Sequence, residues 1–574
     1  MTRKFAPATA LALAVLATQP VSAADYFFDA SAPGGGNGSA ANPWSSLSSF
    51  NSLDLAPGDY VNLAGTFDVP SGGLTLTSED SGTAANPVTI RGFNGSKATL
   101  NAGNSFGLSA TNVGGVKVES LRLLGSGPTS RGGDGLYTNT YDGIRFFNDQ
   151  GDKKQTVHIN DVHVEGFGKN GIRVEGINGA SGFDDVRITN ALAHRNQVAG
   201  VSFEGDYNAA NKSAFTNVYI GKVTASDNRG RANRPQEGNT GNGIVIGQVN
   251  GAVIERSVAH HNGIDGASKL GGAVGIWAWD SNGVVIQHNE SYANGTAGHH
   301  DGGGFDLDGG VTNSVMQYNY SHDNDGAGFL LAQFSGAREY SGNVVRFNIT
   351  QNDGRKNGYG GIHSFGPITS ADVYNNTVFM SPALKADLRS DSDVPAGIKF
   401  RDGSTKNIRF FNNLIILTDE VGGTNADPGI WAIPVSFKDA GASGFEFLNN
   451  NYWKMDGSPL GNSSDPQAIN LDPMLFAAGL GSELDNADDL EELLEAYKIS
   501  DLSPLIDRGL DLSSAGIDAG LRDFYGLGKH GASWEIGASE SIAGGVAVPE
   551  PAGFAAVALA GIAALSRRRS DSAR

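Results

Sequence analysis

The sequence contains no cysteine and has a deficit of basic residues. Without cysteine, neither a disulfide bond nor a thiolate metal site can form. The chain has 41 Lys and Arg against 61 Asp and Glu, and its formal net charge is −20. An acidic surface of this kind repels nucleic acids and anionic lipids, so we expect neither as a partner. A polyanionic substrate would need local basic residues or a bridging cation.

Long apolar segments are also scarce, and the N-terminal one predicts a signal peptide. Arg3 and Lys4 precede an apolar stretch at 8–18, and residues 21–23 (Val-Ser-Ala) supply the small side chains of a cleavage site. This stretch is too short to span a bilayer. We expect signal peptidase to remove residues 1–23 during export; a buried N-terminal helix is the alternative.

The C-terminal end carries a second export-related pattern. Residues 548–551 read Val-Pro-Glu-Pro, an apolar run follows at 552–565, and three arginines stand at 567–569. An apolar run with a basic C-terminal edge pauses in a membrane with the arginines inside. The layout resembles the PEP-CTERM sorting tail of Gram-negative bacteria. That resemblance implies processing by an exosortase-type enzyme and an extracellular or cell-surface location; a plain C-terminal anchor is the alternative.

Removing both ends makes the protein more acidic. The end segments together carry four net positive charges, so the mature chain has a formal net charge of about −24. We divide the chain into a signal peptide at 1–23, a folded domain at 24–540, and a linker with sorting tail at 541–574.

Glycine is abundant, at 81 residues, but it has no collagen period. Instead, a glycine followed by an alternating strand recurs about every 30 residues, with variable spacing, which predicts a coil whose corners accept insertions. We expect an all-β solenoid of about ten or more coils. The copies begin at Gly143, Gly171, Gly200, Gly243, Gly275, Gly304, Gly328, Gly361, Gly397 and Gly429.

Asparagine and histidine recur at the corners of these units. Because Asn tolerates the left-handed conformation and its amide can bond the next coil, we interpret two Asn columns as structural ladders. One column contains Asn262, Asn294, Asn324 and Asn352, and the other contains Asn289, Asn319 and Asn348. A further corner column, which we also interpret as structural, contains His194, Ser226, His260, Tyr292 and His322.

These features resemble the pectate-lyase-like right-handed parallel β-helix superfamily. The segments at 26–29 (Tyr-Phe-Phe-Asp) and 42–44 (Asn-Pro-Trp) resemble its N-terminal start, and 534–538 (Trp-Glu-Ile-Gly-Ala) resembles its end. The resemblance implies the fold for most of 24–540. It says little about chemistry, because this fold carries lyases, hydrolases and non-enzymes. Before the C-terminal end, 486–497 predicts one amphipathic helix with an Asn cap, which would cover an open end of the coil.

Alternation along each glycine-led strand points the second and fourth residues after the glycine outward. This rule brings aromatic and charged side chains onto one face, beside a corner where most long insertions fall. A face of this kind suits a sugar chain, because tryptophan rings stack on pyranoses and charged groups bond hydroxyls. The candidate substrate-binding residues are Trp277, Trp279, Glu204, His299 and His300. Packing of the tryptophans beneath the loops is the alternative.

Two chemistries fit this face. In a polysaccharide lyase, Asp301, Asp306 and Asp308 would hold Ca²⁺, and Lys399 or Arg401 would abstract the proton. In a glycoside hydrolase, Asp306 and Asp308 would be acid and base or nucleophile, at a spacing that does not choose between retention and inversion.

The candidate catalytic residues are Asp306, Asp308, His363, Lys399 and Arg401. We expect a monomer that acts on polysaccharide. The competing hypothesis is a non-catalytic protein that binds exopolysaccharide or forms part of the matrix.

Overall fold

A computed structural model describes most of the folded domain. It covers residues 23–541, apart from 94, 128–136, 179–180, 208–212, 233–237, 299, 384–393, 402–403, 420–431, 438–443, 461–463 and 486. The signal peptide and the sorting tail therefore lie outside the described residues, except for Ala23 and Ser541. Among the described residues, no helix is long and apolar enough to cross a membrane.

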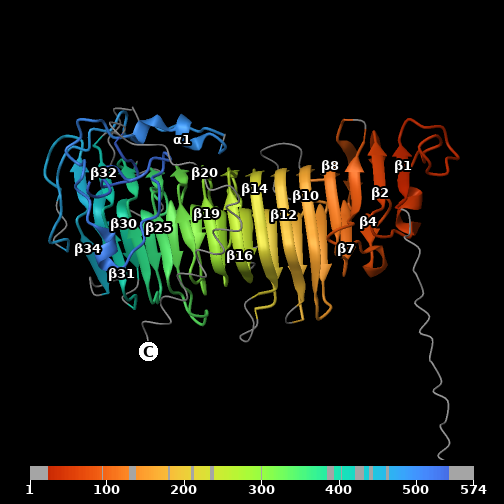
Figure 1. Cartoon of the computed structure of the whole chain (residues 1–574), viewed down its shortest axis with the longest axis horizontal. Helices are drawn as coiled ribbons and strands as arrows, with labels where there is room; N and C mark the ends of the chain where they lie inside the picture. Colours follow the sequence, from red (N-terminus) through yellow and green to blue (C-terminus); the bar gives the residue numbers. More distant parts are fainter. Residues whose placement is uncertain are drawn as a thin grey trace, which may run out of the picture.

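The domain is a parallel β-helix in which each strand pairs with the equivalent strand of the next coil (Figure 1). One sheet contains the glycine-led strands. Its members are β4 (Leu74–Leu76), β7 (Leu108–Thr111), β9 (Ile144–Asn148), β11 (Asn170–Gly176), β13 (Ala199–Gly205), β15 (Asn242–Gly247), β18 (Val274–Trp279), β21 (Gly303–Leu307), β24 (Phe329–Ala332), β27 (Gly360–Phe365), β30 (Ala396–Arg401) and β33 (Ile433–Ser436). We call this the groove sheet.

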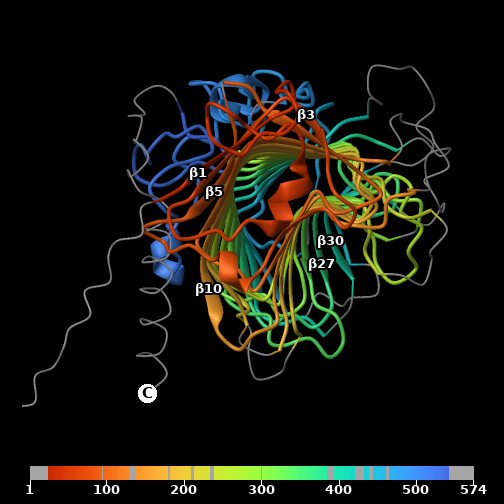
Figure 2. The ribbon, with the colours of Figure 1, turned by 90° about the vertical axis from the view of Figure 1, so that its right-hand side faces the viewer.

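The remaining strands form a second sheet that bends into two faces, so the coils enclose a tube (Figure 2). Four long strands run across the bend: β8 (Val116–Gly125), β10 (Lys153–Glu165), β12 (Gly182–His194) and β14 (Phe215–Ser226). The first face also contains β1 (Asp25–Asp29), β2 (Tyr60–Ala64), β5 (Val88–Gly92), β16 (Val249–Glu255), β19 (Asn282–Gln287), β22 (Val315–Gln317), β25 (Asn343–Arg346), β28 (Ala371–Tyr374), β31 (Ile408–Phe411) and β34 (Phe445–Leu448). The other face also contains β3 (Thr66–Asp68), β6 (Ala98–Gly103), β17 (Val258–His260), β20 (Glu290–Tyr292), β23 (Tyr320–His322), β26 (Ile349–Gln351), β29 (Thr377–Met380), β32 (Leu414–Leu417) and β35 (Asn451–Lys454).

The interior of the tube is filled by the inward residues of the groove sheet and of the bent sheet. Residues directly after the glycines, such as Ile276 and Phe305, have no exposed surface. The glycines themselves are needed because the chain approaches closely there: a Cβ on Gly275 would lie 2.1 Å from Ser291 Oγ. At the N-terminal mouth, a 3-10 helix (Leu47–Ser52) buries Leu47 and Phe50 in the same core.

The Asn columns form continuous ladders inside two corners, as the sequence predicts. The Asn319 amide donates to Ile286 O and Asn348 Oδ1, and its Oδ1 accepts from the backbone N–H and the amide of Asn289. The ladder asparagines do not adopt the left-handed conformation themselves; the residue before each of them does, as His288 and Tyr318 show. The corner turns at that residue, and the following Asn bonds the coils on either side.

One ladder contains a different residue from the one that the sequence predicts. Asn324 donates to Asp353 Oδ1 at 2.7 Å, so Asp353 and not Asn352 is the next member. Asn352 is instead the left-handed residue of that corner, with φ of 59°. The column of His194, Ser226, His260, Tyr292 and His322 is in register, with stacked rings at Tyr292 and His322.

The helix expected at 486–497 is much shorter. Among the residues that the structure describes, only α1 (Leu490–Leu493) is α-helical. Turns of 3-10 helix follow at Glu495–Tyr497 and Leu512–Ala515, and another lies near the start of the domain at Ser78–Asp80. Leu490 and Tyr497 pack with Tyr318 and Tyr320 on the flank of the bent sheet, so this segment does not cap the tube. The amphipathic pattern reflects packing against that flank.

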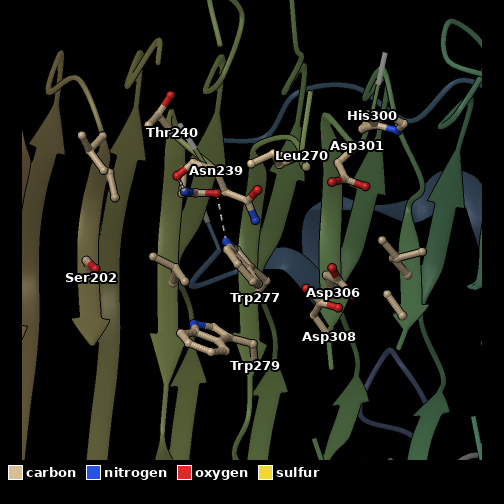
Figure 3. A pocket seen from close by; sticks show the side chains of 18 of the residues that line it. Ser202, Asn239, Thr240, Leu270, Trp277, Trp279, His300, Asp301, Asp306 and Asp308 are labelled. Carbon is tan, nitrogen blue, oxygen red and sulfur yellow. Dashed lines mark hydrogen bonds between the residues drawn. The ribbon is translucent and has the colours of Figure 1, made fainter. Parts of the chain in front are cut away.

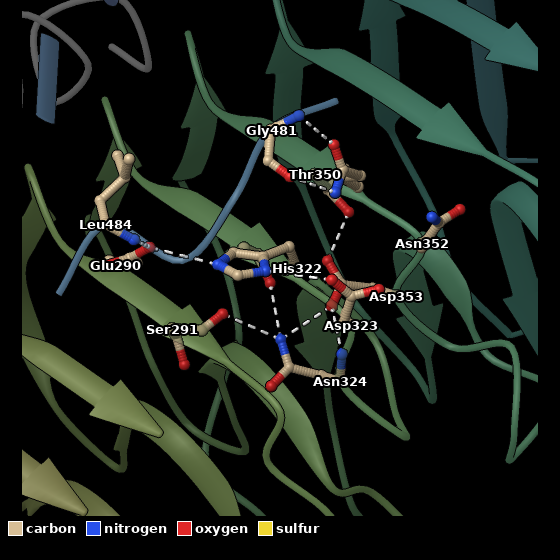
Figure 4. A network of polar contacts seen from close by, with 12 residues as sticks. Glu290, Ser291, His322, Asp323, Asn324, Thr350, Asn352, Asp353, Gly481 and Leu484 are labelled. Carbon is tan, nitrogen blue, oxygen red and sulfur yellow. Dashed lines mark hydrogen bonds and ion pairs between the residues drawn. The ribbon is translucent and has the colours of Figure 1, made fainter. Parts of the chain in front are cut away.

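Residues 481–485, which precede α1, cross the same flank (Figure 4), and we call this segment the strap. The backbone N–H groups of Leu484 and Asp485 each donate to the Glu290 carboxylate at 2.8 Å. His322 bonds Glu290 and Asp323; burial alone would lower its pKa, but these two carboxylates raise the pKa to about 9. A protonated imidazole therefore neutralises the buried Glu290 that holds the strap.

We expect Asn319→Ala to destabilise the fold by about 2–4 kcal/mol. The substitution removes the amide that donates to the Ile286 carbonyl, and it leaves the backbone N–H of Asn289 without its acceptor inside the coil. Chemical denaturation would measure the loss. Asn250→Ala is the matched control, because Asn250 is exposed and accepts one hydrogen bond from Asn282. Equal stability of the two variants would contradict the structural role of the ladder.

Candidate functional site

The outward column of the groove sheet is in register through nine of its ten glycine-led strands. Trp277 lies beside Asp306, as predicted, with Val245 and Leu330 on the outer sides of the pair. Farther along, His363 lies between Leu330 and Lys399. The same ladder reads Arg145, Arg173, Ser202, Val245, Trp277, Asp306, Leu330, His363 and Lys399.

The tenth strand departs from the expected repeat. Ser436 lies beside Lys399, and Val435 lies beside Ile398, so the strand is β33 and does not begin at Gly429. Residues 429–431 lie outside the described residues. A corner insertion of variable length precedes this strand, and spacing alone cannot locate a strand after such an insertion.

A groove with a cavity volume of about 1040 Å³ lies over this sheet (Figure 3). Strands β11 to β30 form its floor, and the loops before β15, β18, β21 and β27 contribute its walls. The wall residues include Asn239, Leu270, His300, Asp301 and Tyr359. These loops share one corner of the coil, so their insertions deepen one side of the same face.

The two tryptophans differ in exposure. Trp277 is only 5% exposed; it packs with Val245 and Val274, and its Nε1 donates to Asn242 Oδ1 at 3.0 Å. The expectation of an exposed stacking ring is therefore wrong for Trp277, because side chains of β13, β15 and β18 pack around it. Trp279 is partly exposed and stacks on Tyr207, with ring centroids 6.2 Å apart.

Three carboxylates project into one part of the groove (Figure 3). Asp306, at the end of β21, is 3% exposed, and its Oδ1 has no hydrogen-bond partner among the described residues. Burial and then the charges of Asp308 and Asp301 raise the pKa of Asp306 well above its usual value. The position of Asp306 between the side chains of Trp277 and Leu330 therefore favours its neutral form.

Asp308 lies one residue beyond the end of β21, which corrects the expectation that it sits in mid-strand. Its side chain is more open to the groove than that of Asp306, and Oδ1 accepts a hydrogen bond from the Gly309 N–H at 2.6 Å. Burial raises the pKa of Asp308 to about 7, and the charge of Asp301 acts in the same direction. Asp308 thus exchanges its proton near neutral pH.

Asp301 occupies the corner before β21, in the left-handed conformation with φ of 53°. Its Oδ2 accepts from the Gly272 N–H at 2.7 Å, and its Oδ1 accepts from the Tyr359 hydroxyl at 3.1 Å. Both partners donate, which suits an ionised carboxylate. Asp301 and Asp308 therefore have contrasting surroundings in the same groove.

The carboxylates do not form a compact cation site. As a set, the oxygens of Asp301, Asp306 and Asp308 do not come within 4.8 Å of one another. Ca²⁺ binds six to eight oxygens at about 2.3–2.6 Å. The expected Ca²⁺ set therefore does not fit the arrangement of these side chains.

The two candidate bases, Lys399 and Arg401, differ in their access to the groove. Lys399 is 1% exposed, does not line the groove, and donates to the carbonyls of Gly358 and Val394. This geometry contradicts its expected role in proton abstraction. Arg401 lines the groove, with its guanidinium 5.8 Å from the centre of the Tyr359 ring.

His363 also lines the groove but is fully buried. Burial and then the charges of Lys399 and Arg401 hold its pKa well below the usual range, so the imidazole is neutral. Its Nδ1 accepts from the Gly360 N–H at 3.3 Å, and Nε2 has no partner among the described residues. Because Nδ1 accepts, the proton of the neutral imidazole lies on Nε2, and His363 can donate one hydrogen bond from the groove floor.

The remaining predicted residues divide into two groups. Glu204 and His300 line the groove, and Glu204 pairs with Arg173 at 2.6 Å. His299 lies outside the described residues.

The sequence analysis did not single out Asn242, which orients Trp277, or Gly272 and Tyr359, which hold Asp301. Asn242 directly precedes Gly243, which begins a glycine-led strand, and this position could have indicated that Asn242 lies near Trp277.

Comparisons with known proteins agree with this architecture. The family described as "Right handed beta helix region" matches residues 177–378. A lacto-N-biosidase from Bifidobacterium longum subsp. longum is 29% identical over 242 residues, which represent 39% of this chain and 13% of that protein. The chain therefore spans about one eighth of the length of this curated relative.

Two solved structures are similar to this chain. The crystal structure of the GH136 lacto-N-biosidase from Eubacterium ramulus covers 67% of this chain and 68% of its own, with a TM-score of 0.50 and 16% identity. The pectate lyase Pel9A covers 91% of this chain and 98% of its own, with a TM-score of 0.42 and 16% identity. The family match and the stacked parallel sheets identify the fold as a right-handed parallel β-helix.

Proposed function

We propose that this protein is an exported glycoside hydrolase that cleaves a glycan bound in the groove. The observation that carries the proposal is the pair of carboxylates with contrasting surroundings: Asp308, with a pKa near 7, and Asp301, which accepts two hydrogen bonds. Glycosidases require one protonated and one ionised carboxyl group at the scissile bond. The similarity to a lacto-N-biosidase supports a carbohydrate substrate.

In this proposal, Asp308 is the general acid. Its proton passes to the glycosidic oxygen as the bond to the anomeric carbon breaks. Asp301 either deprotonates the attacking water or attacks the anomeric carbon itself, and addition of water completes both routes. Burial raises the pKa of Asp306 well above its usual value, which favours an uncharged side chain beside Asp308 on the groove floor.

The lyase hypothesis receives less support from this geometry. Lys399 bonds backbone carbonyls behind the groove, and the three aspartates do not gather into a calcium site. The non-catalytic hypothesis keeps one specific observation in its favour, the partly exposed stack of Trp279 and Tyr207. That platform can hold a sugar without any bond cleavage.

The location of the protein is also part of the proposal. The N-terminal and C-terminal patterns at 1–23 and 548–569 support export, removal of the signal peptide and sorting by an exosortase-type enzyme. A glycan-cleaving protein would then act in the extracellular space or at the cell surface of a Gram-negative bacterium. A fold without cysteine does not depend on the redox state of that compartment.

Replacing either proposed carboxylate should abolish hydrolysis. A glycan panel screened for new reducing ends, and for the ultraviolet absorbance of unsaturated lyase products, identifies the reaction. Asp308→Asn and Asp301→Asn should each lower kcat/KM by at least about 1,000-fold, with unchanged circular dichroism. Glu446→Gln is the control, since Glu446 is exposed in β34 on another face. Unsaturated products, or full activity of Asp308→Asn, would exclude the proposed mechanism.

The rate should fall as the pH rises through about 7. Asp308 must be protonated to act as the general acid, and its pKa is raised to about 7 in the fold. Activity should therefore persist at pH values below about 7, where Asp308 holds its proton. A kcat/KM profile from pH 4 to 9 tests this assignment. A basic limb that is absent, or that lies near pH 10, would show that another group supplies the proton.

The two tryptophans should respond differently to truncation. Trp277→Ala removes a buried ring and its hydrogen bond to Asn242, so we expect a loss of about 3–5 kcal/mol of stability. Trp279→Ala should cost about 1 kcal/mol of stability but weaken glycan binding by about tenfold. Calorimetry with a bound glycan measures both effects. Trp453→Ala, in β35 outside the groove, should leave the binding affinity unchanged.

A further inference from the structure

A second polar cluster lies away from the groove, on the bent sheet. His163 and Glu165 stand two residues apart near the end of β10, so their side chains project from the same face. His194, the last residue of β12, lies beside Glu165 in the next coil. The parallel register therefore brings two imidazoles and one carboxylate together from only two strands.

The three side chains converge on a single point. His163 Nε2 lies 2.8 Å from His194 Nε2 and 3.0 Å from Glu165 Oε2, and His194 Nε2 lies 3.2 Å from the same oxygen. Within the described part of the chain, no other group of three His, Asp or Glu side chains brings its ligand atoms this close together. The centre of this triangle lies about 1.7 Å from each atom, slightly inside the Zn–N and Zn–O bond lengths of about 2.0–2.2 Å.

Holding these three atoms so close together costs free energy unless they share a bound partner. Two imidazole nitrogens that face each other can share only one proton, and the carboxylate oxygen accepts from that same side. A cation slightly above the plane of the three atoms would satisfy all three lone pairs at once.

We propose that His163, Glu165 and His194 bind a first-row divalent metal ion, with Zn²⁺ as the natural choice. Two imidazoles and one carboxylate are a ligand set typical of Zn²⁺. The side chains are 16–20% exposed, so water can reach a fourth position. The site belongs to a different face from the groove, and the proposal is independent of the hydrolase assignment.

Two arginines limit the affinity of this site. Arg122 and Arg195 lie 3.4 and 3.3 Å from the oxygens of Glu165. They fix the orientation of the carboxylate, as outer residues around metal ligands do, but their charges oppose a dication. We therefore expect binding of one Zn²⁺ with a dissociation constant in the micromolar range.

Isothermal titration of the purified full chain with Zn²⁺ tests the proposal. The wild type should bind one equivalent, and saturating Zn²⁺ should raise Tm by about 2–4 °C. His163→Ala and His194→Ala should each abolish the bound equivalent and the Tm shift. His158→Ala is the matched control, because His158 lies on the same strand and pairs with Asp185 at 3.0 Å; this variant should bind Zn²⁺ like the wild type.

A second measurement separates ligand loss from misfolding. Glu165→Gln keeps the shape of the side chain, so its circular dichroism should be unchanged while its Zn²⁺ affinity falls at least tenfold. Co²⁺ bound by nitrogen and oxygen ligands gives visible absorption bands, which should appear in the wild type and in His158→Ala alone. Absence of Zn²⁺ binding by the wild type, or undiminished binding by folded His163→Ala and His194→Ala, would overturn the proposal.

Discussion

The fold depends on hydrogen bonds between each coil and the next, including those made at the corners. A coil can turn only where one residue adopts the left-handed conformation, and even bulky residues such as Tyr318 and Phe347 do so here. The Asn after that residue bonds both neighbouring coils, which satisfies backbone groups that the turn leaves inside the protein. The register of all three faces follows from these corners.

The register places side chains from different coils next to one another on one surface, where they can act together. Residues far apart in the sequence, such as Trp277 and Asp306, become neighbours because each coil adds one rung to every column. The corners tolerate insertions, and loops from several coils rise over one side of the groove sheet. Burial then gives the aspartates their contrasting properties: the apolar neighbours of Asp306 favour its neutral form, while the donors around Asp301 suit a charge.

Alternation and spacing predict the columns well because both depend only on local geometry. The outward positions from Arg145 to Lys399 could be assigned this way. Burial could not be assigned, because it depends on contacts outside each strand: side chains of β13 and β15 pack on Trp277, and a loop carbonyl, that of Gly358, holds Lys399. The short α1 illustrates the same limit, since the flank of the sheet determines its packing.

The two clusters illustrate how the same column rule produces different chemistry. On the groove sheet, Trp277 and Asp306 occupy neighbouring rungs, burial desolvates Asp306, and the three aspartates do not converge. On the bent sheet near His163, the three ligand atoms meet at one point and remain partly open to water. Carboxyl groups that are buried but apart from one another favour proton transfer. Ligand atoms that meet at one point and remain open to water favour binding of an ion. A rigid coil can carry both sites because neither requires the other face to move.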